Sequence, residues 1–134
     1  MSTAITAVGD AAPDVKVLIV EDDVWLADHE ASVLRGAGYS VEVAPHAPAA
    51  IELVDSFKPN VLVADVLLGG TTSFALLHEL QTYQDTQHIP VVLCTNLAEQ
   101  FDKKQLELYG VKRVIDKTSM HPSDIIAAVK AVTV

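Results

Sequence analysis

The sequence is poor in cysteine, in basic residues and in long apolar runs. Its one cysteine, Cys94, excludes an internal disulfide and any zinc site built on several cysteines. Nine Lys and Arg residues stand against 18 Asp and Glu residues, and the net charge of −9 argues against an electrostatic grip on nucleic acid phosphates. No apolar run approaches the ~20 residues of a membrane-spanning helix, and the N-terminus lacks the basic start and apolar stretch of a secretion signal. We therefore expect a soluble, cytoplasmic protein without direct contact to nucleic acid or membrane.

The residues that are present fit one globular domain. Half of the 134 residues are hydrophobic, and a chain of this length removes roughly two thirds of its unfolded surface from water. Small and polar residues near the N-terminus predict a flexible tail over 1–13, followed by a folded domain over 14–134.

Five apolar runs have the length of strands. Those at 15–20, 61–64 and 91–94 are β-branched and continuous, which is typical of strands buried on both faces of a parallel sheet. Two weaker runs, 39–44 and 112–115, read as edge strands. The sequence therefore predicts three central strands and two edge strands.

Each predicted strand is followed by a helical pattern of apolar residues. The five stripes are Leu26, Val33, Leu34 and Ala37; Ala50, Leu53, Val54 and Phe57; Phe74, Leu77 and Leu80; Phe101, Leu106 and Tyr109; and Ile125, Ile126, Val129 and Val132. Strands that alternate with helices give a (βα)5 chain, and right-handed crossovers then favour a doubly wound, five-stranded parallel α/β sheet.

Polar residues follow four of the predicted strands. They are Glu21, Asp22 and Asp23; Asp65; Thr95 and Asn96; and Asp116 and Lys117. Because the carboxyl ends of parallel strands form the binding edge of such a sheet, we expect these side chains to converge. Taken alone, the three acids at 21–23 could instead cap the following helix.

The expected cluster has the chemistry of phosphoryl transfer. Crowded carboxylates repel one another, and their hard oxygens suit Mg²⁺. Asp65 could act as the nucleophile that forms an aspartyl-phosphate. The metal and Lys117 would neutralise charge on the transferring group, and the Thr95 hydroxyl would bind one of its oxygens.

These residues resemble the receiver domain of bacterial two-component response regulators. The resemblance covers residues 14–133 and rests on VLIVEDD at the first strand, VLVAD at the third, PVVLCT at the fourth and VIDK at the fifth. The spacing also matches, because Asp65 follows Asp22 by 43 residues and precedes Thr95 by 30 and Lys117 by 52. The family has the flavodoxin-like strand order 2-1-3-4-5.

The resemblance implies a Mg²⁺ site at the phosphoacceptor. Asp65 would be the phosphoacceptor, and Glu21 and Asp22 the acidic pair, with Asp22 the more direct metal ligand. The backbone carbonyl of Leu67 would complete the protein's share of the coordination.

The resemblance also implies a role in signalling. Thr95 would be the switch hydroxyl and Lys117 the phosphate-binding lysine. A histidine kinase or phosphotransfer protein would donate the phosphoryl group, so the protein would be a phosphoacceptor that assists its own phosphorylation and dephosphorylation rather than an enzyme. A downstream protein, or a second copy in a homodimer, would use the face of the fourth helix, fifth strand and fifth helix. We expect a stand-alone receiver without an output domain.

The sequence departs from the family pattern around the site. Gly69-Gly70 replaces the usual residues of the loop after the phosphoacceptor and predicts a looser loop. Thr118 replaces the usual proline, so we expect a trans bond or a strained turn after Lys117. Val114 replaces the family's switch aromatic. Leu67 and Leu97 would flank the attacking water and predict a slowly decaying phosphoryl group.

Three other interpretations compete with a phosphorylated receiver. A pseudo-receiver would keep the fold as a protein interaction module and never be phosphorylated, which the altered loops favour and the retained acidic, Thr and Lys positions oppose. A flavodoxin-like cofactor binder would need a phosphate-cradling loop where the three acids stand. A hydrolase with Asp65 as nucleophile would need a general acid at Leu67.

Overall fold

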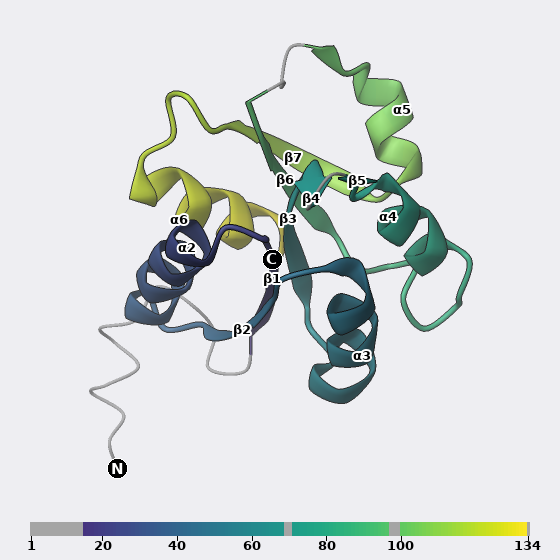
Figure 1. The fold of residues 1–134 in the computed structure, drawn as a ribbon, viewed down its shortest axis with the longest axis horizontal. Coiled ribbons are helices and arrows are strands. Elements are labelled where there is room, and N and C mark those ends of the chain that lie inside the picture. The colour runs from purple at the N-terminus through teal and green to yellow at the C-terminus, as the bar shows by residue number, and fades with distance from the viewer. Residues whose placement is uncertain (1–14, 69–70, 97–99, 134) are drawn as a thin grey trace.

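The expected alternation of strands and helices is present. The computed structural model describes residues 15–68, 71–96 and 100–133 (Figure 1). The elements in chain order are β1 (Lys16–Val20), α2 (Val24–Gly36), β2 (Ser40–Ala44), α3 (Ala47–Phe57), β3 (Val61–Asp65), β4 (Leu67–Leu68), β5 (Thr71–Thr72), α4 (Phe74–Gln81), β6 (Val91–Thr95), α5 (Lys103–Leu108), β7 (Val111–Asp116) and α6 (Pro122–Val132). The predicted tail, the glycine pair after Leu68 and the leucine after Asn96 lie outside the described residues.

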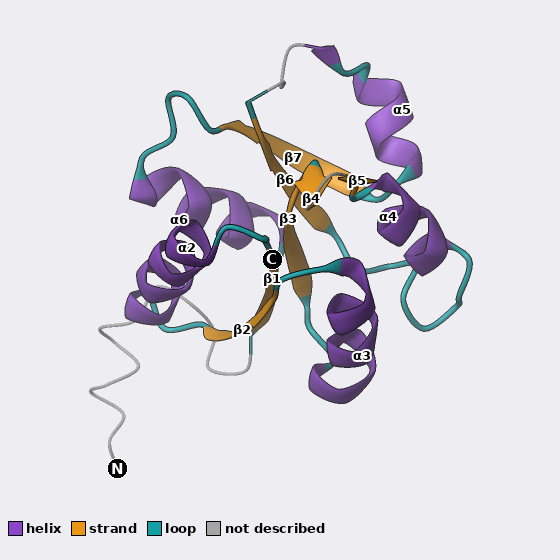
Figure 2. Cartoon of the chain, viewed as in Figure 1, coloured by secondary structure: helices purple, strands orange, loops and turns teal. Residues whose placement is uncertain are grey.

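The main sheet confirms the predicted architecture. Its five strands run parallel in the order β2-β1-β3-β6-β7, which is the flavodoxin-like order (Figure 2). The two runs predicted as edge strands, β2 and β7, lie at the edges. Because all five strands are parallel, their carboxyl ends share one edge of the sheet.

Alternate residues of the central strands enter two separate apolar layers. In β1, Val17 and Ile19 belong to the layer beneath α2 and α6, whereas Leu18 and Val20 belong to the layer beneath α3, α4 and α5. Figure 1 shows the same division, with α2 and α6 on one side of the sheet and the other three helices opposite. This two-sided burial explains why the central strands read as continuous apolar runs.

The buried face of α2 differs from the predicted stripe. Leu34 and Ala37 are buried as expected and Leu26 and Val33 are half-buried, but the helix also buries three positions outside the predicted stripe: Ala27, Glu30 and Ala31. The small alanines give a weak apolar signal, and Glu30 gives a polar one. Tertiary packing therefore made the buried face wider than the stripe that hydrophobicity indicated.

The loop after Asp65 contains a short hairpin that the sequence did not predict. Leu67 pairs with Thr72 and Leu68 with Thr71 in an antiparallel arrangement. The N–H of Ser73 donates to the carbonyl of Val66 at 2.7 Å. The hairpin therefore keeps the start of α4 close to the end of β3.

None of the helices in the described part of the chain has the length and apolar character to cross a membrane.

Candidate functional site

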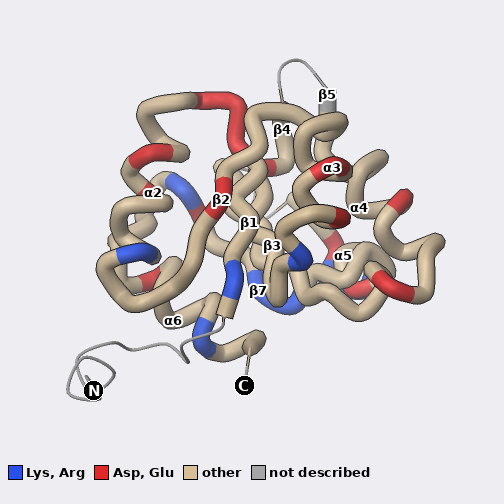
Figure 3. The backbone as a smooth tube through the Cα atoms, turned by 90° about the horizontal axis from the view of Figure 1, so that it is seen from below, with Lys and Arg blue, Asp and Glu red and all other residues tan. Residues whose placement is uncertain are grey.

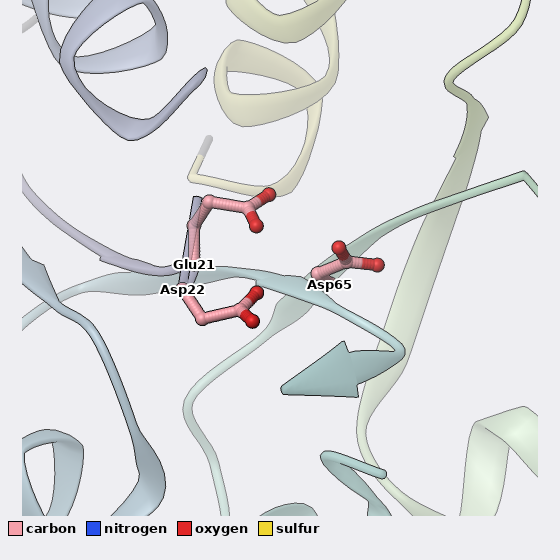
Figure 4. A group of neighbouring side chains, drawn as sticks. All are labelled: Glu21, Asp22 and Asp65. Carbon is pink, nitrogen blue, oxygen red and sulfur yellow. The ribbon is translucent and has the colours of Figure 1, made fainter. Parts of the chain in front are cut away.

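Three carboxylates meet at the carboxyl edge of the sheet. Glu21 and Asp22 follow β1, and Asp65 ends β3. One oxygen from each of the three lies within 4.8 Å of the others. Figure 4 shows the carboxylates of Glu21 and Asp22 directed toward the side on which Asp65 lies. The predicted convergence of these residues is therefore confirmed.

The acids at 21–23, which connect β1 to α2 (Figure 3), have two different structural roles. Asp23 is the N-cap of α2, because its Oδ1 accepts a hydrogen bond from the N–H of Leu26 at 3.0 Å. The N–H of Asp23 in turn donates to Oε2 of Glu21 at 3.2 Å. Capping therefore accounts for Asp23, and Glu21 and Asp22 remain for the cluster.

Lys117 joins two of the three carboxylates. Its Nζ donates to Oδ2 of Asp65 at 2.6 Å and to Oε1 of Glu21 at 3.0 Å. Its backbone N–H donates to the carbonyl of Thr95 at 3.0 Å, which anchors the lysine beside the end of β6. The ammonium therefore lies beside the carboxylate of Asp65 and offsets part of the negative charge of the cluster.

Burial and pairing oppose each other at this ion pair. Burial alone would lower the pKa of Lys117, but the hydrogen bonds to Asp65 and Glu21 outweigh it and raise that pKa. Burial raises the pKa of Glu21, and the hydrogen bond from Lys117 offsets part of that rise. The lysine is thus fixed in its charged form.

The other predicted residues are placed unequally. Thr95 ends β6 at the same edge and is 2% exposed. Asp116 is not among the three clustered carboxylates, and its Oδ1 instead accepts hydrogen bonds from the N–H and the hydroxyl of Thr118, at 2.9 and 2.7 Å. These hydrogen bonds lower the pKa of Asp116. The described residues contain no cis peptide bond, so the bond after Lys117 is trans, one of the two expected outcomes.

Leu67 stays next to Asp65 through its backbone. Its N–H donates to Oδ1 of Asp65 at 3.4 Å, and its side chain is 54% exposed. The roles given to its carbonyl and its side chain remain predictions. Leu97, the other leucine of that prediction, lies outside the described residues.

The donor set fits a hard divalent cation. Three carboxylates and one ammonium leave two negative charges uncompensated at the cluster. Carboxylate oxygens are the ligands that Mg²⁺ prefers, and one or two of them suffice because this ion keeps several waters. Asp22 is exposed and Asp65 half-buried, so both remain accessible to a hydrated ion.

Sequence reasoning missed Glu30, a buried acid behind this cluster. It is 1% exposed, and its Oε2 has no hydrogen-bond partner in the described part of the chain. Burial is the largest cause that raises its pKa, the negative charges of Glu21 and Asp65 contribute in the same direction, Lys117 opposes them, and the resulting pKa is about 7. Its spacing from Ala27 and Leu34 on one helix face was the signal that could have found it.

The geometry agrees with what comparison to known proteins finds. The family described as the response regulator receiver domain matches residues 17–130. Transcriptional regulatory protein BaeR of Escherichia coli O6:H1 is 28% identical over 117 residues, which cover 87% of this chain and 47% of the relative. Phosphate regulon transcriptional regulatory protein PhoB of Pseudomonas aeruginosa is 29% identical over 116 residues, 87% of this chain and 50% of the relative. The chain thus spans about half the length of these curated relatives.

Solved structures give the same result. The signal receiver domain of a signal transduction histidine kinase from Syntrophus aciditrophicus has a TM-score of 0.74 and 26% identity, and the match covers 89% of each chain. Sequence, fold and family match therefore agree over nearly the whole described chain, and this protein belongs to the response regulator receiver domain family of two-component signalling.

Proposed function

We propose that this protein accepts a phosphoryl group on Asp65 from a histidine kinase or phosphotransfer protein, in a Mg²⁺-dependent phosphorelay in the cytoplasm. The 2.6 Å contact between Nζ of Lys117 and Oδ2 of Asp65, beside three clustered carboxylates, carries this proposal. Transfer to a carboxylate requires neutralisation of negative charge, and this arrangement supplies it next to the nucleophile.

The proposed step is a displacement at phosphorus. A carboxylate oxygen of Asp65 attacks the phosphorus of a phosphohistidine, the P–N bond breaks, and its electron pair stays on the imidazole nitrogen, which takes a proton from solvent. Bound Mg²⁺ would supply neutralising charge for the phosphoryl oxygens. Lys117 would shift its hydrogen bond from Asp65 to a phosphoryl oxygen, and the Thr95 hydroxyl would bind another.

The structure supports different metal roles for the two acids after β1. Both oxygens of Glu21 already accept hydrogen bonds, from Lys117 and from the N–H of Asp23. We assign direct coordination to Asp22, Asp65 and the carbonyl of Leu67 because the resemblance to receiver domains implies it. Pairing alone does not separate Glu21 from Asp65, whose two oxygens also accept hydrogen bonds, from Lys117 and from the N–H of Leu67. Glu21 would hold Lys117 and reach the ion through a water molecule.

As a signalling phosphoacceptor, the protein would pass on its signal through contacts with other proteins. The face of α5, β7 and α6 exposes apolar Leu108 and Val114 and includes an edge strand. An exposed edge with apolar side chains can pair with another chain. A downstream protein, or a second copy in a homodimer, would use this face.

Binding of beryllium fluoride, a phosphoryl mimic, tests the proposal. Trp25 is 79% exposed and lies three residues after Asp22, so its fluorescence provides the signal. We expect a Mg²⁺-dependent fluorescence change with beryllium fluoride, and an adduct of one phosphoryl group by mass spectrometry after incubation with a small phosphodonor.

Asp65→Asn should abolish both signals, whereas Asp55→Asn, an exposed change on α3 with the same change of charge, should leave them intact. If the wild-type protein gives neither signal, the protein is a pseudo-receiver and the proposal is wrong.

A further inference from the structure

Glu30 is a buried acid that the proposed phosphoryl transfer does not use. It lies two turns into α2, on the face that packs toward the sheet and α6. A carboxylate in such a layer is normally paired, because an isolated buried charge is strongly disfavoured. Here Oε2 of Glu30 has no hydrogen-bond partner among the described residues.

The direction of α2 brings this carboxyl toward the site. The helix begins directly after the acids at 21–23, so its N-terminus lies at the carboxyl edge of the sheet. Side chains of an α-helix tilt toward the helix N-terminus. Glu30 therefore extends from the interior of the layer toward the rear of the carboxylate cluster.

The charges that act on Glu30 belong to the same cluster. Burial is the largest cause of the raised pKa of Glu30; Glu21 and Asp65 add to that rise and Lys117 opposes it. Burial likewise raises the pKa of the Cys94 thiol in β6 most, and Glu30 contributes in the same direction. The buried residues of α6, the helix packed against α2, are all apolar: Ile125, Ala128 and Val129. No hydrogen bond or ion pair joins Glu30 to the cluster in the described part of the chain, so the coupling acts through space.

We propose that Glu30 is an electrostatic positioning residue of the phosphorylation site, whose carboxylate charge strengthens binding of a divalent cation at Glu21, Asp22 and Asp65. This inference rests on the proposed function. Coupling of this kind is reciprocal: ionised Glu30 raises the affinity for the cation, and the bound cation favours ionisation of Glu30 by the same factor. Cation binding near neutral pH therefore releases a proton from Glu30, which is a carboxylic acid beforehand and a carboxylate afterwards.

Titration of the full chain with MgCl₂ tests the inference by two readouts. The affinity for Mg²⁺ is read from Trp25 fluorescence, and the proton release from calorimetry in two buffers of different ionisation enthalpy. At about pH 8, where Glu30 is mostly ionised, Glu30→Gln should weaken Mg²⁺ binding by about tenfold. At about pH 5.5, where the wild-type carboxyl is mostly protonated, the two proteins should bind equally.

A matched variant separates the charge of Glu30 from the net charge of the chain. Asp28→Asn removes one exposed charge from the same helix and should leave affinity and proton release unchanged. Equal affinity and equal proton release for wild type and Glu30→Gln at both pH values would refute the inference. If wild type binds no Mg²⁺ at all, the proposed function fails first, and both proposals fall for different reasons.

A folding defect would not block the test. If Glu30→Gln does not fold, Glu30→Met replaces it, because an apolar chain of similar length suits the layer. The proton release of the wild-type protein can also be measured without any variant. Release confined to the pH range of the ordinary Asp and Glu carboxyls, with none near neutral pH, would overturn the inference without any variant.

Discussion

Glu30 should make the metal-free protein less stable as the pH rises through neutrality. Its pKa is about 7 in the folded state and 4.5 for the unperturbed carboxyl. Between these values the unfolded chain has lost the proton and the folded chain still holds it, so ionisation progressively favours unfolding. The contribution of the protonated carboxyl to the free energy of unfolding is fully present below pH 4.5 and is lost by about pH 7.

The size of the effect follows from the same two values. A difference of about two and a half pH units corresponds to about 3 kcal/mol of unfolding free energy, at 1.36 kcal/mol per unit. Because Glu30 is 1% exposed, solvent screening leaves most of this energy in place. In a domain of ordinary stability this is a large fraction of the total.

Equilibrium urea unfolding of wild type and Glu30→Gln, at about pH 5 and about pH 8 without metal, measures the effect. The amide buries an unpaired polar group at either pH, so its own cost cancels when the two conditions are compared. We expect the variant to gain about 2.5 kcal/mol relative to wild type between the two conditions, because the unfolded carboxyl is already largely ionised at about pH 5. Asp28→Asn on the exposed face of α2 should show no such gain.

Parallel pH profiles for wild type and Glu30→Gln would refute the reasoning. They would mean that water or a rearranged side chain solvates the carboxyl in solution. Oε2 of Glu30 would then have a hydrogen-bond partner in the folded protein in solution.

Three further predictions concern the site and the helix that follows β2. Leu67→Asn should shorten the lifetime of the phosphoryl group by roughly tenfold, because the amide can orient the attacking water; decay followed by mass spectrometry that is already fast and does not change would contradict the role of the leucine. Lys117→Met should weaken beryllium fluoride binding by about a hundredfold, which is the loss typical of one charge-stabilising donor. The same variant should bind Mg²⁺ more tightly, because one positive charge is gone. Fluorescence titrations with each ligand separate the two effects, and weaker Mg²⁺ binding would show that the lysine only maintains the fold. His46 caps α3 through Nδ1, which accepts an N–H at 3.1 Å, so His46→Ala should cost about 1 kcal/mol and His46→Asp little or nothing; equal urea midpoints for the two variants would exclude a capping role.

The sequence was sufficient for the fold because burial on both faces makes each central strand a continuous apolar run. The weaker runs at 39–44 and 112–115 marked the edges for the same reason. Predicted strand ends were off by at most one residue, because the end of a strand is decided by hydrogen-bond pairing with its neighbours, which an apolar run does not show. For β7 the pairing extends from Val111 to Asp116, one residue beyond the predicted run at each end.

The site was predictable where chemistry sits directly after a strand, and unpredictable where packing decides. Asp65 and Lys117 were found because strand ends of a parallel sheet converge. Asp116 is not part of the carboxylate cluster because Thr118 donates two hydrogen bonds that hold its carboxylate in the turn. Glu30 was missed because a charged residue on a helix is normally assigned to solvent, and only the packing of α2 against the sheet and α6 buries it.

Because of the position of Glu30, a change of charge at the carboxylate cluster would also affect α2. Lys117 and Thr95 connect the cluster to β6 and β7, on one side of the central strands. Asp22 and Glu30 instead connect it to α2, because one precedes that helix and the other lies within its buried face. With Asp22, the proposed metal ligand, at its start and Glu30 inside its packing layer, α2 would respond at both points to one bound cation. A receiver built this way would signal through the layer between α2 and α6 as well as through the face around β7, and hydrogen exchange in α6 on Mg²⁺ binding should therefore differ between wild type and Glu30→Gln.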